Sequence, residues 1–264
     1  MSSFYLMGNA SRSQMLGCVI KTKNKTVIID GGTVNDSAQM VAFLKENADS
    51  HVDAWFFTHP HHDHIGCFVE IRKNEPSISV DNLYYCFPNL TDEVHAPLAR
   101  SEHEASLWDD IKEWKNTHKV CAGEIFEFDD VKIRVLRTFN SDIIGINDSS
   151  AVYRIEGPRH SILILGDLGV NGGIDTMNRC PLELLRADYT QMAHHGQNGV
   201  SREFYEYIKP KRCIWAAPEW LWNNDRGGGF DTDKFKTVRT REWMAELGVT
   251  EHFVEKDGIQ RIEF

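Results

Sequence analysis

The fold and the chemistry of this chain are indicated by one short stretch, Thr58-His59-Pro60-His61-His62-Asp63-His64-Ile65-Gly66. Four histidines and one aspartate occupy six consecutive positions of this stretch. Imidazole and carboxylate are preferred ligands of zinc and related divalent metals, and this many positions can supply two sites at once. A solvated loop that happens to be rich in histidine is the alternative. However, twelve histidines in 264 residues would rarely place four in six positions beside a buried strand. The stretch therefore predicts a metal centre.

Alternating strand and helix patterns surround the histidine stretch. The apolar, β-branched run 52–58 directly before it predicts a buried strand, and 65–73 predicts a helix that leaves it. Further strands are predicted at 4–8, 16–21, 26–30, 78–87, 124–128, 131–138, 151–156, 161–165, 189–193, 213–217, 251–255 and 259–264. Further helices are predicted after Asn35 or Asp36, at 201–208 and at 233–247. Asp257-Gly258 predicts that the last two strands form a hairpin.

No linker or repeat divides the chain. The mixture of strands and helices favours one α/β domain of layered sheets over residues 1–264. A polar insertion near 89–119 interrupts the pattern, and Leu107, Ile111 and Trp114 predict a helix within it. Six cysteines are scattered without a Cys-x-x-Cys pair, so we expect buried, reduced side chains rather than disulfides or a thiolate zinc site.

Charge and hydropathy exclude some functions. The formal net charge of −10 disfavours tight, nonspecific binding of nucleic acid, because neutralising phosphates requires a basic surface. It leaves open the cleavage of a small phosphodiester that metal ions hold. The first residues lack the pattern of a signal peptide, and no apolar run approaches the 18 residues of a membrane span. We therefore expect a cytoplasmic protein that does not enter the membrane, and the oligomeric state stays open.

These motifs resemble those of a known family. Residues Thr58–Gly66 resemble the signature loop of the metallo-β-lactamase superfamily. Three further matches follow its order along the chain: Asp30-Gly31-Gly32, Leu165-Gly166-Asp167 and His194-His195-Gly196. Asn147-x-x-Ser150 and the ending near 256–259 are most similar to one branch, which includes the soluble hydrolase domain of the bacterial DNA-uptake protein ComEC.

The resemblance implies a fold and a set of ligands. The fold would be a four-layer αβ/βα sandwich with two divalent metals at one edge of its sheets. His59 and His61 would hold the first metal, and Asp63 and His64 the second. Asp167 would bridge both metals. Either His194 or His195 would complete the second site; we prefer His195, which leaves His194 to face the substrate.

One departure from the family pattern concerns the first metal. Many members carry a further histidine between the signature loop and the bridging acid. The candidates are His95, His103, His118 and His160, all of which we expect at the surface. Asn147 occupies the position that the branch would place near the metal. A neutral amide there could bind weakly, hold a water or contact the substrate.

The resemblance implies hydrolysis by hydroxide that bound metals supply, with zinc as the default and manganese or iron as alternatives. Asp63 would orient the water, while His194 and Asn147 would act on the substrate or the leaving group. A phosphoester, in particular a phosphodiester, is the first substrate hypothesis. A lactone, thioester or β-lactam is the second, and a non-catalytic metal-binding regulator is the third.

One aromatic, glycine-rich stretch has two readings. Trp215, Trp220 and Trp222 are followed by Arg226-Gly227-Gly228-Gly229. They could form a loop over the site, with Arg226 meeting an anion. Alternatively, the tryptophans fill the core.

Overall fold

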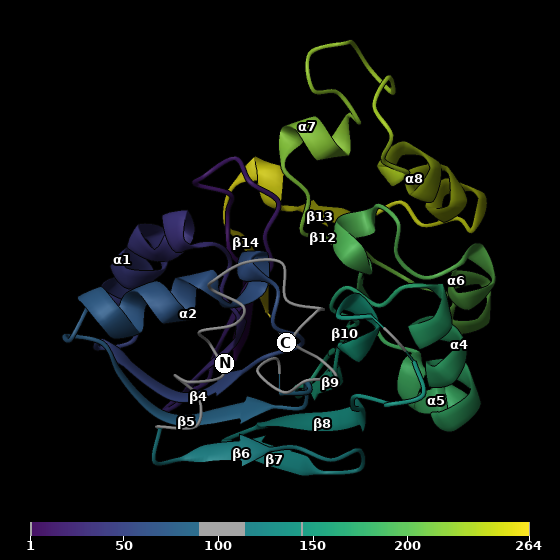
Figure 1. The fold of residues 1–264 in the computed structure, drawn as a ribbon. Helices are drawn as coiled ribbons and strands as arrows, with labels where there is room; N and C mark the ends of the chain where they lie inside the picture. Colours follow the sequence, from purple (N-terminus) through teal and green to yellow (C-terminus); the bar gives the residue numbers. More distant parts are fainter. Residues whose placement is uncertain (1, 90–113, 144, 264) are drawn as a thin grey trace.

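The computed structural model describes residues 2–89, 114–143 and 145–263. Two seven-stranded mixed sheets face each other, and helices cover both outer faces (Figure 1). This is the four-layer αβ/βα sandwich that the motifs predicted. The helix predicted around Leu107 and Ile111 lies outside the described residues.

The first sheet contains the strand that precedes the histidine stretch. Its order is β14-β1-β2-β3-β4-β5-β6. The strands are β1 (Ser3–Leu6), β2 (Gly17–Lys21), β3 (Thr26–Asp30), β4 (His51–Phe56), β5 (Ser79–Tyr85), β6 (Thr117–Lys119) and β14 (Gln260–Glu263). Pairing is antiparallel from β14 to β3 and parallel from β3 to β6.

The second sheet also has three antiparallel pairs followed by three parallel pairs. Its order is β13-β12-β11-β10-β9-β8-β7, with antiparallel pairs from β7 to β10 and parallel pairs from β10 to β13. The strands are β7 (Ile125–Phe128), β8 (Val131–Arg137), β9 (Val152–Glu156), β10 (Ser161–Ile164), β11 (Tyr189–Gln191), β12 (Cys213–Trp215) and β13 (His252–Val254).

Three apolar layers hold the sandwich together. Side chains of both sheets, such as Phe4, Phe56 and Tyr153, fill the space between them. A second layer joins the first sheet to α1 (Ser37–Asn47) and α2 (His62–Asn74). A third joins the second sheet to its helices, which are α4 (Val170–Arg179), α5 (Leu182–Leu185), α6 (Arg202–Ile208), α7 (Glu219–Trp222) and α8 (Thr237–Glu246). Burial on both faces explains why the central strands read as continuous apolar runs.

The parallel halves of the sheets set the place of the site. Parallel strands end at the same edge of a sheet, and β3 and β4 are parallel neighbours in one sheet, as β10 and β11 are in the other. The polar residues that follow these strands therefore converge at one edge of the sandwich.

Two expectations from the sequence are wrong, and several short elements were not predicted. The last two strands do not form a hairpin, because β13 pairs with β12 while β14 pairs with β1 in the other sheet. Cys121 is exposed, whereas the other five cysteines are buried and all six are free. Strand β6 and helices α4, α5 and α7 were not predicted, since each is short or, in the case of α4, contains two glycines in its first turn. None of the described helices is both long and apolar enough to cross a membrane.

Candidate metal centre

Two groups of buried ligand atoms lie at the shared edge of the sheets. One contains His59, His61 and Asp167, and the other contains Asp63, His64 and His195. Within each group, one ligand atom of every residue lies within 4.8 Å of the others. A third combination, at the opposite end of β4, already serves as an ion-pair network around Lys25 and Asp53 and has an exposed member.

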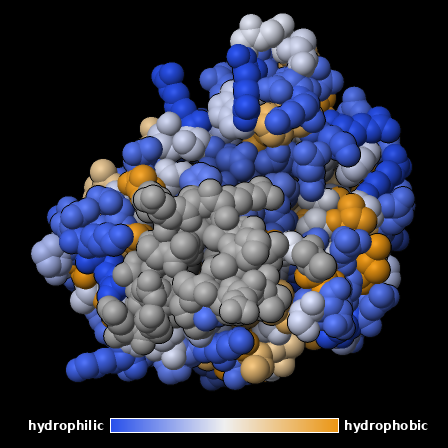
Figure 2. Space-filling model, in the orientation of Figure 1, coloured by the Kyte–Doolittle hydropathy of each residue, from blue (hydrophilic) through white to orange (hydrophobic). Residues whose placement is uncertain are grey.

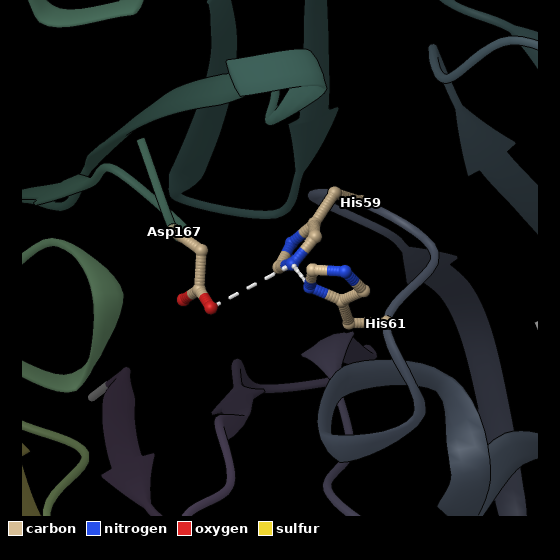
Figure 3. Close-up of side chains that lie close together, drawn as sticks. All are labelled: His59, His61 and Asp167. Atoms are coloured by element: carbon tan, nitrogen blue, oxygen red, sulfur yellow. Dashed lines mark hydrogen bonds and ion pairs between the residues drawn. The ribbon is translucent and has the colours of Figure 1, made fainter. Parts of the chain in front are cut away.

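The first group comes from the loop between β4 and α2 and from the end of β10. His59 Nε2 lies 2.9 Å from His61 Nδ1 and 3.7 Å from Asp167 Oδ2. Both imidazoles point toward the same point beside the carboxylate, as Figure 3 shows. This geometry brings three ligand atoms around one position.

The second group uses the first turn of α2 and the turn after β11. His195 Nε2 lies 3.4 Å from Asp63 Oδ2. His64 lies on the other side, with its Nε2 3.2 Å from Asp167 Oδ1. Because α2 begins at His62, helical geometry turns Asp63 and His64 inward while His62 stays outside with a 59% exposed side chain.

Asp167 is shared between the groups. Its Oδ2 lies 3.4 Å from His195 Nε2 and 3.7 Å from His59 Nε2, while its Oδ1 faces His64. The backbone N–H of Asp167 donates to Ser150 Oγ at 3.1 Å, which fixes the turn after β10. The carboxylate is therefore in the position that a bridging ligand requires.

Outer hydrogen bonds orient the histidines. His64 Nδ1 contacts Asp30 Oδ2 at 2.8 Å, and His195 Nδ1 contacts the carbonyl oxygen of Ala216 at 2.9 Å. His59 Nδ1 lies 3.1 Å from the hydroxyl of Thr58. Such partners hold Nδ1–H and leave the Nε2 lone pair for a metal.

The donor set fits metal ions. His64 Nε2, His195 Nε2 and Asp167 Oδ1 are buried and make no hydrogen bond of acceptable geometry within the described residues. Buried polar atoms are almost always satisfied, so several such atoms facing one space indicate a missing partner. Imidazole nitrogens and carboxylate oxygens are suitable ligands for a pair of divalent cations.

Electrostatics keep the carboxylates ionised. Burial alone would raise the pKa of Asp167, but His195, His64 and the other histidines lower it well below its usual range. The pKa of Asp63 is lowered for the same reason, despite burial. Burial would lower the pKa of His64, but Asp167 and Asp30 raise it to about 10. Opposite charges on these acids and on His64 therefore stabilise one another.

His194 and Asn147 lie beside the two groups without belonging to either. His194 Nε2 lies 3.7 Å from Asp167 Oδ2 and 3.5 Å from Asn147 Nδ2. The side chain of His194 is 19% exposed, unlike the fully buried His195. Asn147 Oδ1 is buried and forms no hydrogen bond among the residues described. His194 can therefore reach solvent or substrate, and Asn147 lies in contact with His194.

The adjacent histidines 194 and 195 lie in a strained turn. His194 and His195 have φ of 53° and 58°, and Gly196 has φ of 78°. Left-handed backbone costs non-glycine residues free energy, and such outliers gather at functional sites. A Cβ on Gly196 would lie 2.4 Å from the Trp215 ring, so only glycine fits there. The turn directs His195 inward and His194 outward.

Several residues that support the centre were not predicted from the sequence. Gln14 Nε2 donates to Asp63 Oδ2 at 2.9 Å, and Gln197 Nε2 donates to Gln14 Oε1 at 3.0 Å. The role of Asp30 was also missed, although its place at the end of a buried strand was a usable signal. No local pattern marks Gln14, because it lies in an irregular loop far from Asp63 in sequence.

The remaining histidine candidates lie away from the centre. His118 pairs with Asn82 Oδ1 at 3.4 Å and is exposed, and His160 lies in the turn between β9 and β10. His95 and His103 lie outside the described residues. Among the described part of the chain, neither group gains a further histidine from this set.

An open pocket of about 1040 Å³ adjoins the second group. Asp63, Gln14 and His62 form its inner end. Its outer walls come from the loop after β1, from α7 and the loop that follows it, and from the turn before β14; they include Arg12, Trp220, Arg226 and Lys256. Of the three tryptophans in the aromatic stretch, Trp215 is in the core, while Trp220 and Trp222 are partly exposed. The pocket therefore reaches the second group at Asp63.

Comparison with known proteins agrees with the fold and with the signature stretch. Residues 18–80 match the sequence model of the metallo-β-lactamase superfamily. The chain is therefore a protein of the metallo-β-lactamase fold that carries the superfamily signature, as the motifs indicated.

One sequence relative and two solved structures are similar to this chain over most of its length. ComE operon protein 3 of Bacillus subtilis is 26% identical over 213 residues, which are 74% of this chain and 26% of that protein. This chain thus spans about a quarter of that relative's length. YhfI from Bacillus subtilis superimposes with a TM-score of 0.60 at 11% identity, covering 99% of both chains. A diphosphatase of the PhnP family superimposes with a TM-score of 0.55 at 17% identity, covering 100% of this chain and 98% of the other.

Proposed function

We propose that this protein is a dinuclear metal-dependent phosphoesterase, with phosphodiesters as its main substrates. One observation carries the proposal: Asp167 lies among the buried histidines of both ligand groups, beside an open pocket whose wall bears cations. The diphosphatase of the PhnP family that superimposes on this chain supports the same class of chemistry.

The ligand assignment follows the two groups. His59, His61 and Asp167 would hold one metal, and Asp63, His64 and His195 the other, with Asp167 shared. Bound there, two divalent cations would lower the pKa of a water molecule and polarise a phosphoryl oxygen. Zinc fits the histidines, and manganese or iron fits the carboxylates.

The surrounding residues would organise the reaction. Asp63 accepts a hydrogen bond from Gln14, so one of its oxygens is held in place while the other stays available to orient a water molecule. His194, partly exposed and 3.5 Å from Asn147, is the candidate donor of a proton to the leaving group. Asn147 would hold His194 and contact the substrate.

A reporter assay tests the proposal. The protein is stripped of metal, loaded with zinc, manganese or iron, and given bis(p-nitrophenyl) phosphate, p-nitrophenyl phosphate, a thioester and a β-lactam. We expect metal-dependent cleavage of the phosphodiester above all. Cleavage of the thioester or β-lactam alone would replace the proposal with hydrolysis of carboxylic acid derivatives. Inactivity with every substrate and metal would favour a non-catalytic role.

A further inference from the structure

The outer wall of the pocket joins three cationic side chains to one aromatic ring. Arg12, Arg226 and Lys256 all line the pocket, although the whole chain carries a formal net charge of −10. The face above α7 and the loop that follows it is largely hydrophilic (Figure 2). Cations in a cleft of an acidic protein attract anionic ligands selectively to that cleft.

Most charges in this wall already have partners. Arg226 lies 3.4 Å from Asp233, and Lys256 pairs with Asp257. The acid Asp225 accepts hydrogen bonds from the backbone of Gly227 and Gly229. By contrast, Arg12 forms no ion pair with any residue that the structure describes, and it is exposed. Its guanidinium is available to a ligand.

Trp220 holds the two arginines on one wall. Its indole N–H donates to the carbonyl oxygen of Arg12 at 2.9 Å. The guanidinium of Arg226 lies 4.4 Å from the centre of the Trp220 ring. Arg12 itself has a φ of 63°, a left-handed conformation that costs a non-glycine residue free energy. A strained residue fixed by a distant indole is consistent with a positioned functional side chain.

From this arrangement we infer that Arg12, supported by Arg226, binds a second phosphate on the substrate, at a distance from the ester that is cleaved. The inference rests on the proposed function and names its substrate class: phosphodiesters that carry a further phosphate group. Guanidinium binds phosphate oxygens with paired hydrogen bonds, and the pocket leads from this wall to Asp63. Trp220 acts as a positioning residue, because it fixes the backbone of Arg12.

Two substrates that differ by one phosphate test the inference. They are thymidine 5′-(p-nitrophenyl phosphate) and the same compound with a 3′-phosphate. We expect the metal-loaded wild type to prefer the 3′-phosphorylated compound about tenfold in kcat/KM. Arg12→Gln should abolish this preference, because it lowers kcat/KM for the 3′-phosphorylated compound more than for the other substrate. Arg239→Gln removes the same charge from α8, outside the pocket, and should leave the preference intact.

Two more variants sharpen the test. Trp220→Phe keeps a ring under Arg226 but loses the N–H, so it should reduce the preference without changing kcat for the unphosphorylated compound. Glu219→Gln removes an acid from the wall and should increase the preference. Equal effects of Arg12→Gln on both substrates, or a reduced preference in Glu219→Gln, would overturn the inference.

A binding measurement separates this inference from the proposed function. Calorimetry compares thymidine 3′,5′-bisphosphate with thymidine 5′-phosphate on the wild type and on Arg12→Gln. Tighter binding of the bisphosphate, lost in the variant, would support the second-phosphate site even if no ester were cleaved. Cleavage of both esters with equal affinity for both nucleotides would support the phosphoesterase and refute the second-phosphate site.

Discussion

At the scale of single residues, the centre depends on a few atoms whose positions are strongly coupled. Asp167 faces histidines on three sides, and each histidine has a fixed partner for its other nitrogen. The burial that strengthens these interactions also makes each of them costly to break. Substitutions at the centre should therefore affect metal content before they affect the fold.

Asp167→Ala tests the shared carboxylate. We expect loss of both metals and a fall in activity of at least about 1000-fold, because one side chain would serve both ions. Metal analysis and the phosphodiester assay measure the two effects, and circular dichroism monitors the fold. Asp257→Ala, an exposed acid outside the centre, should keep both metals. Two retained metals and a normal rate in Asp167→Ala would refute the assignment.

The adjacent histidines should have separable roles. His195→Ala removes a fully buried ligand atom and should lose one metal. His194→Ala should keep both metals and lower kcat by about 100-fold, because it removes a proton donor. If His194→Ala instead lost a metal, His194 would be a ligand and the proton donor would have to be another residue.

At the scale of elements, the centre depends on how strand ends are held. The turn after β11 and the start of β10 show two ways of doing this. In the turn after β11, Gly196 leaves room for the ring of Trp215. At the start of β10, Asp188 bonds to Ser161 and Lys211. Both are accessible to matched substitutions.

Gly196→Ala tests the turn that carries the histidine pair. The added Cβ would lie 2.4 Å from the Trp215 ring, with a φ of 78°. Gly248→Ala is the control, because φ is 80° there but nothing lies within 4 Å. We expect urea unfolding to show a loss of about 1 kcal/mol for Gly248→Ala and of about 3 kcal/mol or more for Gly196→Ala. Equal losses of unfolding free energy in the two variants would mean that the Trp215 ring moves to accommodate the added Cβ.

Asp188 joins the starts of β10 and β11. It accepts hydrogen bonds from Ser161 and pairs with Lys211 at 2.8 Å. Burial raises its pKa, but these partners outweigh it and lower the pKa to about 2. Because the folded value is below the unfolded value of about 3.9, the stabilisation is complete above about pH 4 and is lost as the pH falls toward 2.

Asp188→Asn should therefore lower the free energy of unfolding at pH 7 by about 1 kcal/mol, a value reduced by solvent screening. The difference from the wild type should shrink on acidification through this range. Urea unfolding at several pH values measures it. Asp142→Asn, at an exposed acid with no ion pair in the described residues, should change stability little at any of these values. A difference that grows with acid would contradict the reasoning.

At the scale of the whole molecule, the parallel half of the first sheet packs on the antiparallel half of the second, as Tyr84 of β5 against Phe126 of β7 shows. Neither sheet holds a complete centre, because His59, His61, Asp63 and His64 follow one sheet and Asp167 and His195 follow the other. The last strand returns to the first sheet beside β1, so the two ends of the described chain lie side by side (Figure 1). The centre therefore requires the whole sandwich.

The acidic surface leads to a prediction about nucleic acids. With a formal net charge of −10, we expect duplex DNA of about 30 base pairs to bind more weakly than about 1 μM at physiological salt. The cations in the pocket wall are too few to neutralise a long backbone. Fluorescence anisotropy with duplexes of increasing length measures this. A steep rise of affinity with length, reversed by salt, would show that a basic face exists.

The histidine stretch could be interpreted from the sequence because its chemistry is local. Four ligand candidates lie within six residues, so no tertiary information was needed to predict a metal centre. The strands could be predicted for a similar reason, since burial on both faces produces continuous apolar runs. Asp167 and the histidine pair were located through family motifs, each at the end of such a run.

The tertiary structure decided what depends on distant contacts. Local turn signals at Asp257-Gly258 predicted a hairpin, but strand pairing across the molecule separated β13 from β14. The choice of His195 as the inward side chain follows from a left-handed turn that packs on Trp215, and the role of Gln14 follows from a loop 49 residues away from Asp63. A sequence pattern indicates whether a residue is buried or exposed within its own element. It does not indicate which distant residue it contacts, because the spacing between the two residues follows no rule.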